Sequence, residues 1–175
     1  MEYSKGDALT GLKLSNGENL PSLEQYLKVG KEHNTKLILE LKALNSKKRE
    51  TKAVQEILAT VKKMGLESRM EYITFSLHAM KEFIRLAPAG TPVFYLNGEL
   101  SPKELKELGA TSLDYHMGVI KKHPEWIKEA HDLGLKVNVW TVDEAEEMKW
   151  LIEQKVDFIT TNEPVVLLEE LKKNK

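Results

Sequence analysis

The sequence contains no cysteine, and this absence removes several kinds of chemistry. Without thiols the chain has no disulfide, no thiolate metal site and no cysteine nucleophile. A cysteine-free chain is compatible with either redox compartment, so its localisation stays open. Residues 1–6 supply neither the basic start nor the apolar core of a secretion signal, so we expect no leader in the chain as it stands.

The chain also lacks an excess of one charge and lacks long apolar runs. Its 26 Lys and Arg residues are balanced by 27 Asp and Glu residues, which gives a formal net charge of -1. No overall field favours a polyanion, and we therefore expect no nucleic-acid partner. No segment approaches the ~18 apolar residues of a transmembrane helix, so we expect no membrane span.

Short apolar runs alternate with longer amphipathic stretches along most of the chain. The apolar runs predict six β-strands, at Lys36–Leu41, Glu71–Ser76, Pro92–Leu96, Thr111–Tyr115, Lys136–Trp140 and Asp157–Thr160. The amphipathic stretches predict helices at Ser22–His33, Lys47–Met64, Leu77–Leu86, Pro102–Leu108, Pro124–Leu133 and Asp143–Gln154, and one more from Pro164. The strand runs are apolar on both faces, which is typical of parallel strands covered on each side. Strand followed by helix, repeated, predicts right-handed crossovers in a parallel sheet.

Cap residues support the predicted helix boundaries. Ser101 followed by a proline indicates an N-cap and a first helical position, and Asp143 is expected to cap the next helix. Three glycines follow predicted helices, where a left-handed residue commonly ends the helix: Gly65, Gly109 and Gly134. The charge-rich stretch Asn45–Lys52 is expected to be a solvated helix start with its preceding loop.

The first predicted helix, Ser22–His33, has no strand ahead of it. A crossover helix normally joins two parallel strands, so this helix lacks its upstream partner. Six βα units with such a helix correspond to an eight-stranded barrel without its first two units. An open doubly wound sheet is the alternative, because it needs only six strands. No linker divides the chain, and we predict one α/β domain over residues 1–175, an incomplete TIM-like (β/α) barrel.

Functional groups lie at the carboxyl ends of the strands in both architectures. Glu40 and Lys42 are two residues apart on a strand, so they share a face, and a charge pair there contradicts burial against helices. The carboxylate suits a hard cation and the ammonium suits a phosphate oxygen. The alternative is a structural ion pair at a strand end.

Two further strand ends carry candidate residues. Asp114 and His116 share a face, and a carboxylate beside an imidazole is a usual general-base arrangement. We favour the alternative that His116 caps the following helix or bonds within its loop. Trp140 either stacks on a ligand or completes the core. The remaining histidines are expected on solvated surfaces: His33, His78, His123 and His131.

Five segments of the chain together resemble the glycerophosphodiester phosphodiesterase family. They are LPSLEQYL at 20–27, LILELK at 37–42, YITFS at 72–76, VNVWTVD at 137–143 and DFITTNEP at 157–164. Their order and spacing match the family over nearly the whole chain. The resemblance implies a TIM-like barrel that hydrolyses glycerophosphodiesters to glycerol phosphate and an alcohol. It also implies a divalent cation, commonly Ca²⁺ or Mg²⁺, and a histidine pair that handles protons.

The resemblance implies roles for residues at the matching positions. Glu40 corresponds to one metal carboxylate, Lys42 to a cation beside the phosphate, and Trp140 to a wall of the glycerol pocket. Thr74 and Phe75 stand where the family usually has Ser-Phe, and Asn162 stands where it usually has Asp.

Most of the family's catalytic segments have no counterpart in residues 1–35. These are the His-Arg-Gly and Glu-Asn-Thr segments, the Glu-x-Asp metal pair and the His-Asp that follows it. A single glutamate is a poor site for Ca²⁺, which takes six to eight oxygen ligands. We therefore expect the chain alone to be inactive.

Three hypotheses follow from this pattern. The chain is part of a phosphodiesterase that is active only as the complete barrel. Alternatively it is a non-catalytic remnant that self-associates through exposed strand edges. A third hypothesis is an unrelated open-sheet enzyme that uses Asp114 and His116 on a small phosphorylated metabolite.

Overall fold

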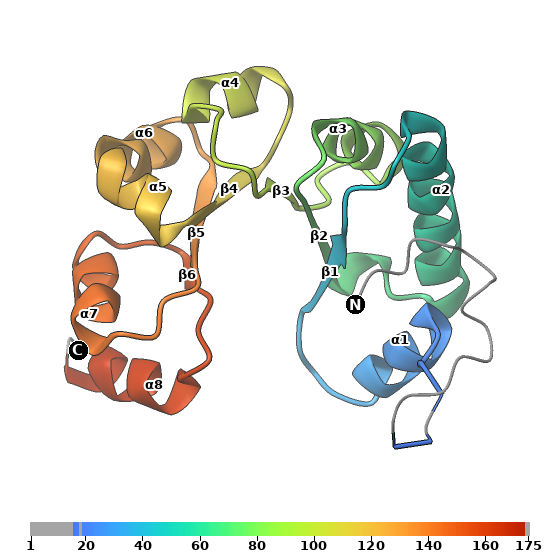
Figure 1. Cartoon of the computed structure of the whole chain (residues 1–175), viewed down its shortest axis with the longest axis horizontal. Helices are drawn as coiled ribbons and strands as arrows, with labels where there is room; N and C mark the ends of the chain where they lie inside the picture. Colours follow the sequence, from blue (N-terminus) through green and yellow to red (C-terminus); the bar gives the residue numbers. More distant parts are fainter. Residues whose placement is uncertain (1–15, 18, 174–175) are drawn as a thin grey trace.

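A computed structural model describes residues 16–17 and 19–173, and six parallel strands form one curved sheet within them (Figure 1). The strands are β1 (Leu37–Leu41), β2 (Met70–Thr74), β3 (Val93–Tyr95), β4 (Ser112–His116), β5 (Lys136–Trp140) and β6 (Phe158–Ile159). Each strand pairs in parallel with the next one along the chain. A doubly wound sheet reverses this order at a switch point. The unreversed order therefore confirms the incomplete TIM-like barrel over the open doubly wound sheet.

Helices line the outside of the curved sheet (Figure 1). They are α1 (Leu23–Lys31), α2 (Lys47–Met64), α3 (Leu77–Leu86), α4 (Pro102–Glu107), α5 (Met117–Lys122), α6 (Glu125–Asp132), α7 (Ala145–Glu153) and α8 (Pro164–Lys173), with a 3₁₀ turn at Glu67–Arg69. The sequence pattern missed α5 and the 3₁₀ turn. Both are too short for a hydrophobic period to be recognised.

The hydrophobic core lies between the outer face of the sheet and these helices. Tyr72 of β2 stacks on Phe83 of α3 with ring centres 4.5 Å apart, and both side chains are buried. Val54 and Val61 of α2 are also fully buried. Each such side chain contributes roughly 1.5–3 kcal/mol when it leaves water. This layer therefore holds the strand ends in place.

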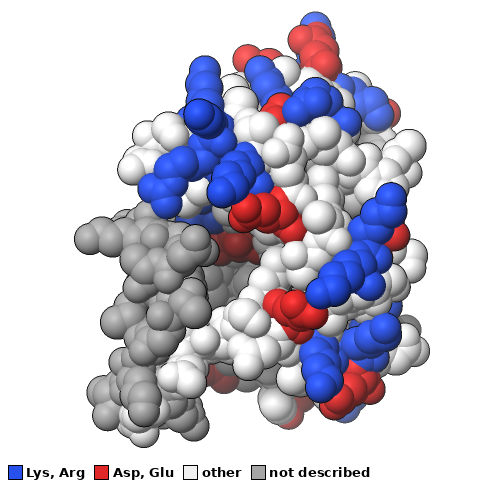
Figure 2. Space-filling view, turned by 90° about the vertical axis from the view of Figure 1, so that its right-hand side faces the viewer, with Lys and Arg blue, Asp and Glu red and all other residues white. Residues whose placement is uncertain are grey.

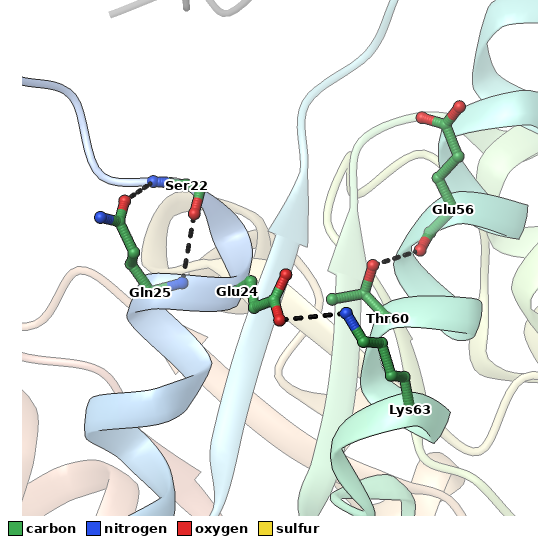
Figure 3. A network of polar contacts seen from close by, with 6 residues as sticks. All are labelled: Ser22, Glu24, Gln25, Glu56, Thr60 and Lys63. Atoms are coloured by element: carbon green, nitrogen blue, oxygen red, sulfur yellow. Dashed lines mark hydrogen bonds and ion pairs between the residues drawn. The ribbon is translucent and has the colours of Figure 1, made fainter.

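Helix α1 is fixed to α2 at the start of the described sheet (Figure 3). Ser22 and Gln25 form a capping box, in which each side chain accepts a hydrogen bond from the backbone N–H of the other residue. Lys63 of α2 donates to Glu24 of α1 over 3.2 Å. An exposed ion pair contributes at most about 1 kcal/mol. The buried Leu27 and the hydrogen bond from Arg69 to the oxygen of Gly30 also hold α1 in place.

Most of the predicted helix ends are confirmed. Ser101 accepts a hydrogen bond from the N–H of Glu104 in a capping box, with Pro102 as the first helical residue. The three glycines have positive φ: Gly65 at 67°, Gly109 at 84° and Gly134 at 72°. A left-handed backbone carries no penalty for glycine, which explains their place after the helices.

The prediction that Asp143 caps the next helix is wrong. Helix α7 begins at Ala145, and its N-cap residue, Glu144, makes no side-chain cap bond. The carboxylate of Asp143 instead accepts hydrogen bonds from the backbone N and from Nδ2 of Asn162, at 2.7 and 2.9 Å. These bonds hold the pKa of Asp143 below its usual value. Asp143 therefore ties the loop after β5 to the loop after β6.

The exposed large hydrophobic side chains of the described residues gather at the two ends of the sheet. They are Tyr26, Val29, Ile38, Phe158, Val165, Leu168 and Leu171, from α1, β1, β6 and α8. An apolar groove of about 720 Å³ runs between α1 and β1. The expectation that strands are covered on each side is therefore wrong for the edge strand β1, where Ile38 is 62% exposed.

Charge on the described surface follows the balanced composition. On the face beside α2, Lys and Arg side chains lie next to Asp and Glu side chains (Figure 2). Among the described residues, none of the helices combines the length and apolarity that a membrane crossing requires.

Candidate functional site

The inner face of the sheet, opposite the helices, carries the polar residues predicted at the strand ends. Pairing places Glu40 beside Ile73, and it places His116 of β4 beside Trp140 of β5. Side chains at paired positions of parallel strands point to the same face. The alternation in β1 agrees, because Glu40 is exposed while Leu41 is buried against the helices.

Glu40 and Lys42 form an ion pair, with 2.6 Å between Oε1 and Nζ. The Lys42 side chain is 71% exposed and the Glu40 side chain 29% exposed. The ammonium also lies 5.6 Å from the centre of the Phe75 ring. The two charged groups thus point the same way, as their spacing predicts, and the ammonium is accessible to an anion.

Trp140 of β5 contacts both Phe75, which lies under Lys42, and His116 at the end of β4. Its ring meets Phe75 edge-on at 5.7 Å and His116 edge-on at 5.2 Å. Its Nε1 donates to the backbone oxygen of Asp114 over 2.9 Å, which fixes the orientation of the indole. We call Lys42, Phe75, His116 and Trp140 the aromatic corner. It combines apolar walls with one exposed cation, which suits a ligand that has both carbon atoms and an anionic group.

Asp114 lies deeper on the inner face and does not pair with His116. Its Oδ1 accepts from Nδ2 of Asn138 over 2.6 Å, and that amide also donates to Oγ1 of Thr160 over 2.9 Å. Burial raises the pKa of Asp114 to about 7, the Asn138 bond lowers it, and the charge of Glu40 raises it further. The carboxyl group therefore keeps its proton to a much higher pH than an exposed aspartate does.

His116 is the N-cap of α5. Its Nδ1 accepts from the N–H of Gly118 over 2.9 Å. This confirms the capping alternative for His116. Among the hydrogen bonds of the described residues, none joins Asp114 to His116, so the general-base arrangement is not formed.

The other sequence candidates make structural hydrogen bonds. Oγ1 of Thr74 donates to the oxygen of Leu41 over 2.8 Å and accepts from the N–H of Ser76 over 3.0 Å. Thr74 therefore joins the ends of β1 and β2. Asn162 is held by Asp143 in the loop after β6. The site roles of Thr74, Phe75 and Asn162 stay predictions.

Sequence reasoning missed two buried polar residues near the strand ends. Asn138 is 7% exposed, and its only sequence signal is an amide inside the apolar run VNVW. Glu50 is 4% exposed, which corrects the expectation that the stretch around it is solvated. No local pattern distinguishes Glu50 from the exposed charges on either side of it.

The described residues do not by themselves fit a complete divalent-cation site. Among them, no group of three or more His, Asp or Glu side chains is placed to hold a metal ion. Glu40 offers one carboxylate and is already paired with Lys42. A hard cation requires about six oxygen ligands.

Comparison with known proteins decides the family. A sequence model of the glycerophosphoryl diester phosphodiesterase family matches residues 3–166. The chain belongs to this family. The resemblance predicted from the five segments is confirmed, and membership overturns the hypothesis of an unrelated open-sheet enzyme.

Solved structures of phosphodiesterases share the fold. A glycerophosphodiester phosphodiesterase from Parabacteroides distasonis is 50% identical with a TM-score of 0.90, over 96% of this chain and 71% of that one. A phosphodiesterase from Oleispira antarctica, solved with its product sn-glycerol-3-phosphate, is 16% identical with a TM-score of 0.70, over 87% of this chain and 61% of that one. At that identity the second comparison shows the fold alone.

A curated relative matches over a shorter stretch. The glycerophosphodiester phosphodiesterase of Caldanaerobacter subterraneus subsp. tengcongensis is 25% identical over 122 residues, which cover 68% of this chain and 49% of the relative. The chain thus spans about half the length of this relative.

Proposed function

We propose that this chain provides the glycerol phosphate-binding part of a phosphodiesterase site. The whole site hydrolyses a glycerophosphodiester with water to glycerol phosphate and an alcohol. The aromatic corner is the observation that supports the proposal. Its exposed ammonium, Lys42, lies over the ring of Phe75, which meets Trp140 edge-on, at the carboxyl end of the barrel strands. Barrel enzymes bind their substrates at this end.

Each group of the corner has a definite task in this proposal. Lys42 binds a phosphate oxygen, and Trp140 and Phe75 pack against the glycerol carbons. Glu40 supplies one oxygen ligand to a divalent cation, Ca²⁺ or Mg²⁺, which polarises the phosphoryl group when the rest of its ligands are present. His116 uses Nδ1 to cap α5. We infer that the described residues bind the phosphate but do not complete hydrolysis.

Titration with sn-glycerol-3-phosphate, followed by calorimetry, tests the role of Lys42. Lys42→Ala removes the accessible cation beside Phe75, and we expect binding to weaken about tenfold or more, because a charge-assisted bond contributes roughly 1.5–3 kcal/mol. Lys52→Ala is the matched control, since Lys52 is equally exposed on α2 and pairs with Glu56. Equal affinity in wild type and Lys42→Ala would contradict the proposal.

Association of two copies through the sheet edges is a second candidate function. It is favoured by the confinement of exposed large hydrophobic side chains to α1, β1, β6 and α8 within the described chain. Edge strands present unpaired backbone groups that pair readily with another chain. Sedimentation velocity at micromolar concentration tests this candidate, and a stable monomer would count against it.

A further inference from the structure

Glu50 is a buried carboxylate that joins two separate parts of the chain. It lies in the first turn of α2 and is 4% exposed. Its Oε1 accepts from the N–H of Leu44 over 3.0 Å, and its Oε2 accepts from Oγ of Ser76 over 2.8 Å. A carboxylate is costly to bury unless both oxygens are hydrogen-bonded, and here both are. Leu44 belongs to the connection from β1 to α2, and Ser76 belongs to the connection from β2 to α3.

These two connections carry two members of the aromatic corner. Lys42 follows β1, and Phe75 precedes Ser76 directly in the chain. The ammonium and the ring lie 5.6 Å apart across the gap between the connections. Strand pairing and the Thr74 bond to Leu41 hold the two strand ends one residue before these side chains. Beyond the strand ends, the placement of the two side chains depends on what holds the connections together. Glu50 forms such a tie behind both of them.

We propose that Glu50 is a positioning residue that, together with the Thr74 bond at the strand ends, sets the placement of Lys42 relative to Phe75. It hydrogen-bonds to neither of them and acts through Leu44 and Ser76. Removing the carboxylate loosens the connection that carries Lys42, so we expect the ammonium to shift relative to the ring while its ion pair with Glu40 remains. The consequence for glycerol phosphate binding rests on the proposed function. The consequence for the placement of Lys42 does not.

Conservative and disruptive variants separate this role from simple stabilisation. Glu50→Gln keeps one acceptor for the N–H of Leu44 and one polar group beside Ser76, whereas Glu50→Ala loses both bonds. Val61→Ala is the matched control for stability. Val61 is fully buried on the same helix but lies three turns from the connections, so its truncation weakens the core without touching the tie.

Nuclear magnetic resonance without any ligand measures the placement directly. The ε-methylene protons of Lys42 carry a ring-current shift from Phe75, and Phe75→Leu gives their unshifted value. We expect Glu50→Ala to move the signal toward that value, Glu50→Gln to restore most of the shift, and Val61→Ala to leave it unchanged at a lowered Tm. An unchanged signal in Glu50→Ala, or an equal change in Val61→Ala, overturns the proposal.

Calorimetry with sn-glycerol-3-phosphate then tests the consequence for binding. We expect Glu50→Ala to bind about tenfold more weakly, because small displacements of binding groups carry large losses, and Glu50→Gln to recover most of the affinity. If wild type binds no glycerol phosphate, the proposed function fails while the ring-current result still decides the positioning role. If Glu50→Ala does not fold, Ser76→Ala removes one of the two bonds together with the N-cap bond of α3, and an unchanged Lys42 signal there overturns the inference.

Discussion

At the scale of single residues, the inner face of the sheet places two carboxyl groups in different environments. Glu40 is partly exposed and forms an ion pair with Lys42. Asp114 is buried and hydrogen-bonded to Asn138, and its pKa is raised to about 7. The charge of Glu40 contributes to that rise, so the two groups interact electrostatically although only Asp114 is buried. Environment, more than residue type, therefore distinguishes them.

The raised pKa of Asp114 predicts a definite pH dependence of stability. The folded state holds a proton up to pH about 7, while the unfolded state releases it near the usual aspartate pKa of 3.8. Stability from this group is therefore complete below pH 3.8 and is lost as pH rises to 7, by up to about 1.4 kcal/mol per pH unit. Asp114→Asn keeps an acceptor for Asn138 but has no group that titrates. We therefore expect that the free energy of unfolding of this variant does not fall in the same way as pH rises.

Urea unfolding at several pH values between 4 and 7 measures the effect. The difference between wild type and Asp114→Asn is expected to grow steadily across this window. Asp132→Asn serves as the control, because Asp132 is exposed and paired with Lys128 on α6. Parallel curves for wild type and Asp114→Asn would show that the raised pKa is wrong.

At the scale of secondary-structure elements, short local patterns predicted most of the fold. The strand Lys36–Leu41 was predicted one residue longer than β1, and the helix Lys47–Met64 was predicted with the bounds of α2. Both segments have a strong apolar pattern. The ends of the helix are also marked by capping residues, Ser46 and Gly65. Asp143 failed as a cap because Asn162, nineteen positions later, offers it two better hydrogen bonds.

The candidate site was predicted less completely than the elements. Glu40, Lys42 and Trp140 stood out because charge or a ring interrupts an apolar run at a strand end. Glu50 could not be recognised in this way, because its burial depends on Ser76 in the next βα unit. Long-range partners of this kind leave no trace in local sequence. Family resemblance supplied the roles, while the contacts between the residues required the structure.

The capping box of α4 is expected to contribute measurably to stability. Ser101→Ala removes the acceptor for the N–H of Glu104 and the partner of its carboxylate, whose pKa is lowered by these bonds. Loss of an N-cap typically lowers the free energy of unfolding by about 1 kcal/mol. Urea unfolding at neutral pH measures the change, and Ser68→Ala, at an exposed position, is the control. A loss no larger than that of Ser68→Ala would contradict the capping role.

At the scale of the whole molecule, the half-barrel leaves two ends that a closed barrel would cover. Ile38 of β1 is exposed on the inner face of the sheet, and Phe158 of β6 is also exposed. The ring of Phe158 meets the ring of Phe94 edge-on, with centres 6.3 Å apart. Both lie at the ends of the strand order in the described sheet. The central strands, in contrast, have both faces buried, as Tyr95 and Phe94 of β3 show. The incompleteness is thus confined to the edges, and the sheet between them is packed as in a full barrel.

Exposed apolar edges predict that association depends on β1. Ile38→Lys places a charge on the inner face of this edge strand, and charged residues at such positions oppose pairing with another chain. We expect wild type to associate at micromolar concentration in sedimentation velocity and Ile38→Lys to shift toward the monomer, with unchanged circular dichroism because Ile38 is 62% exposed. Ala59→Lys adds the same charge at an exposed position of α2 and is expected to behave as wild type. Equal association of both variants would show that the contact does not depend on this face of β1.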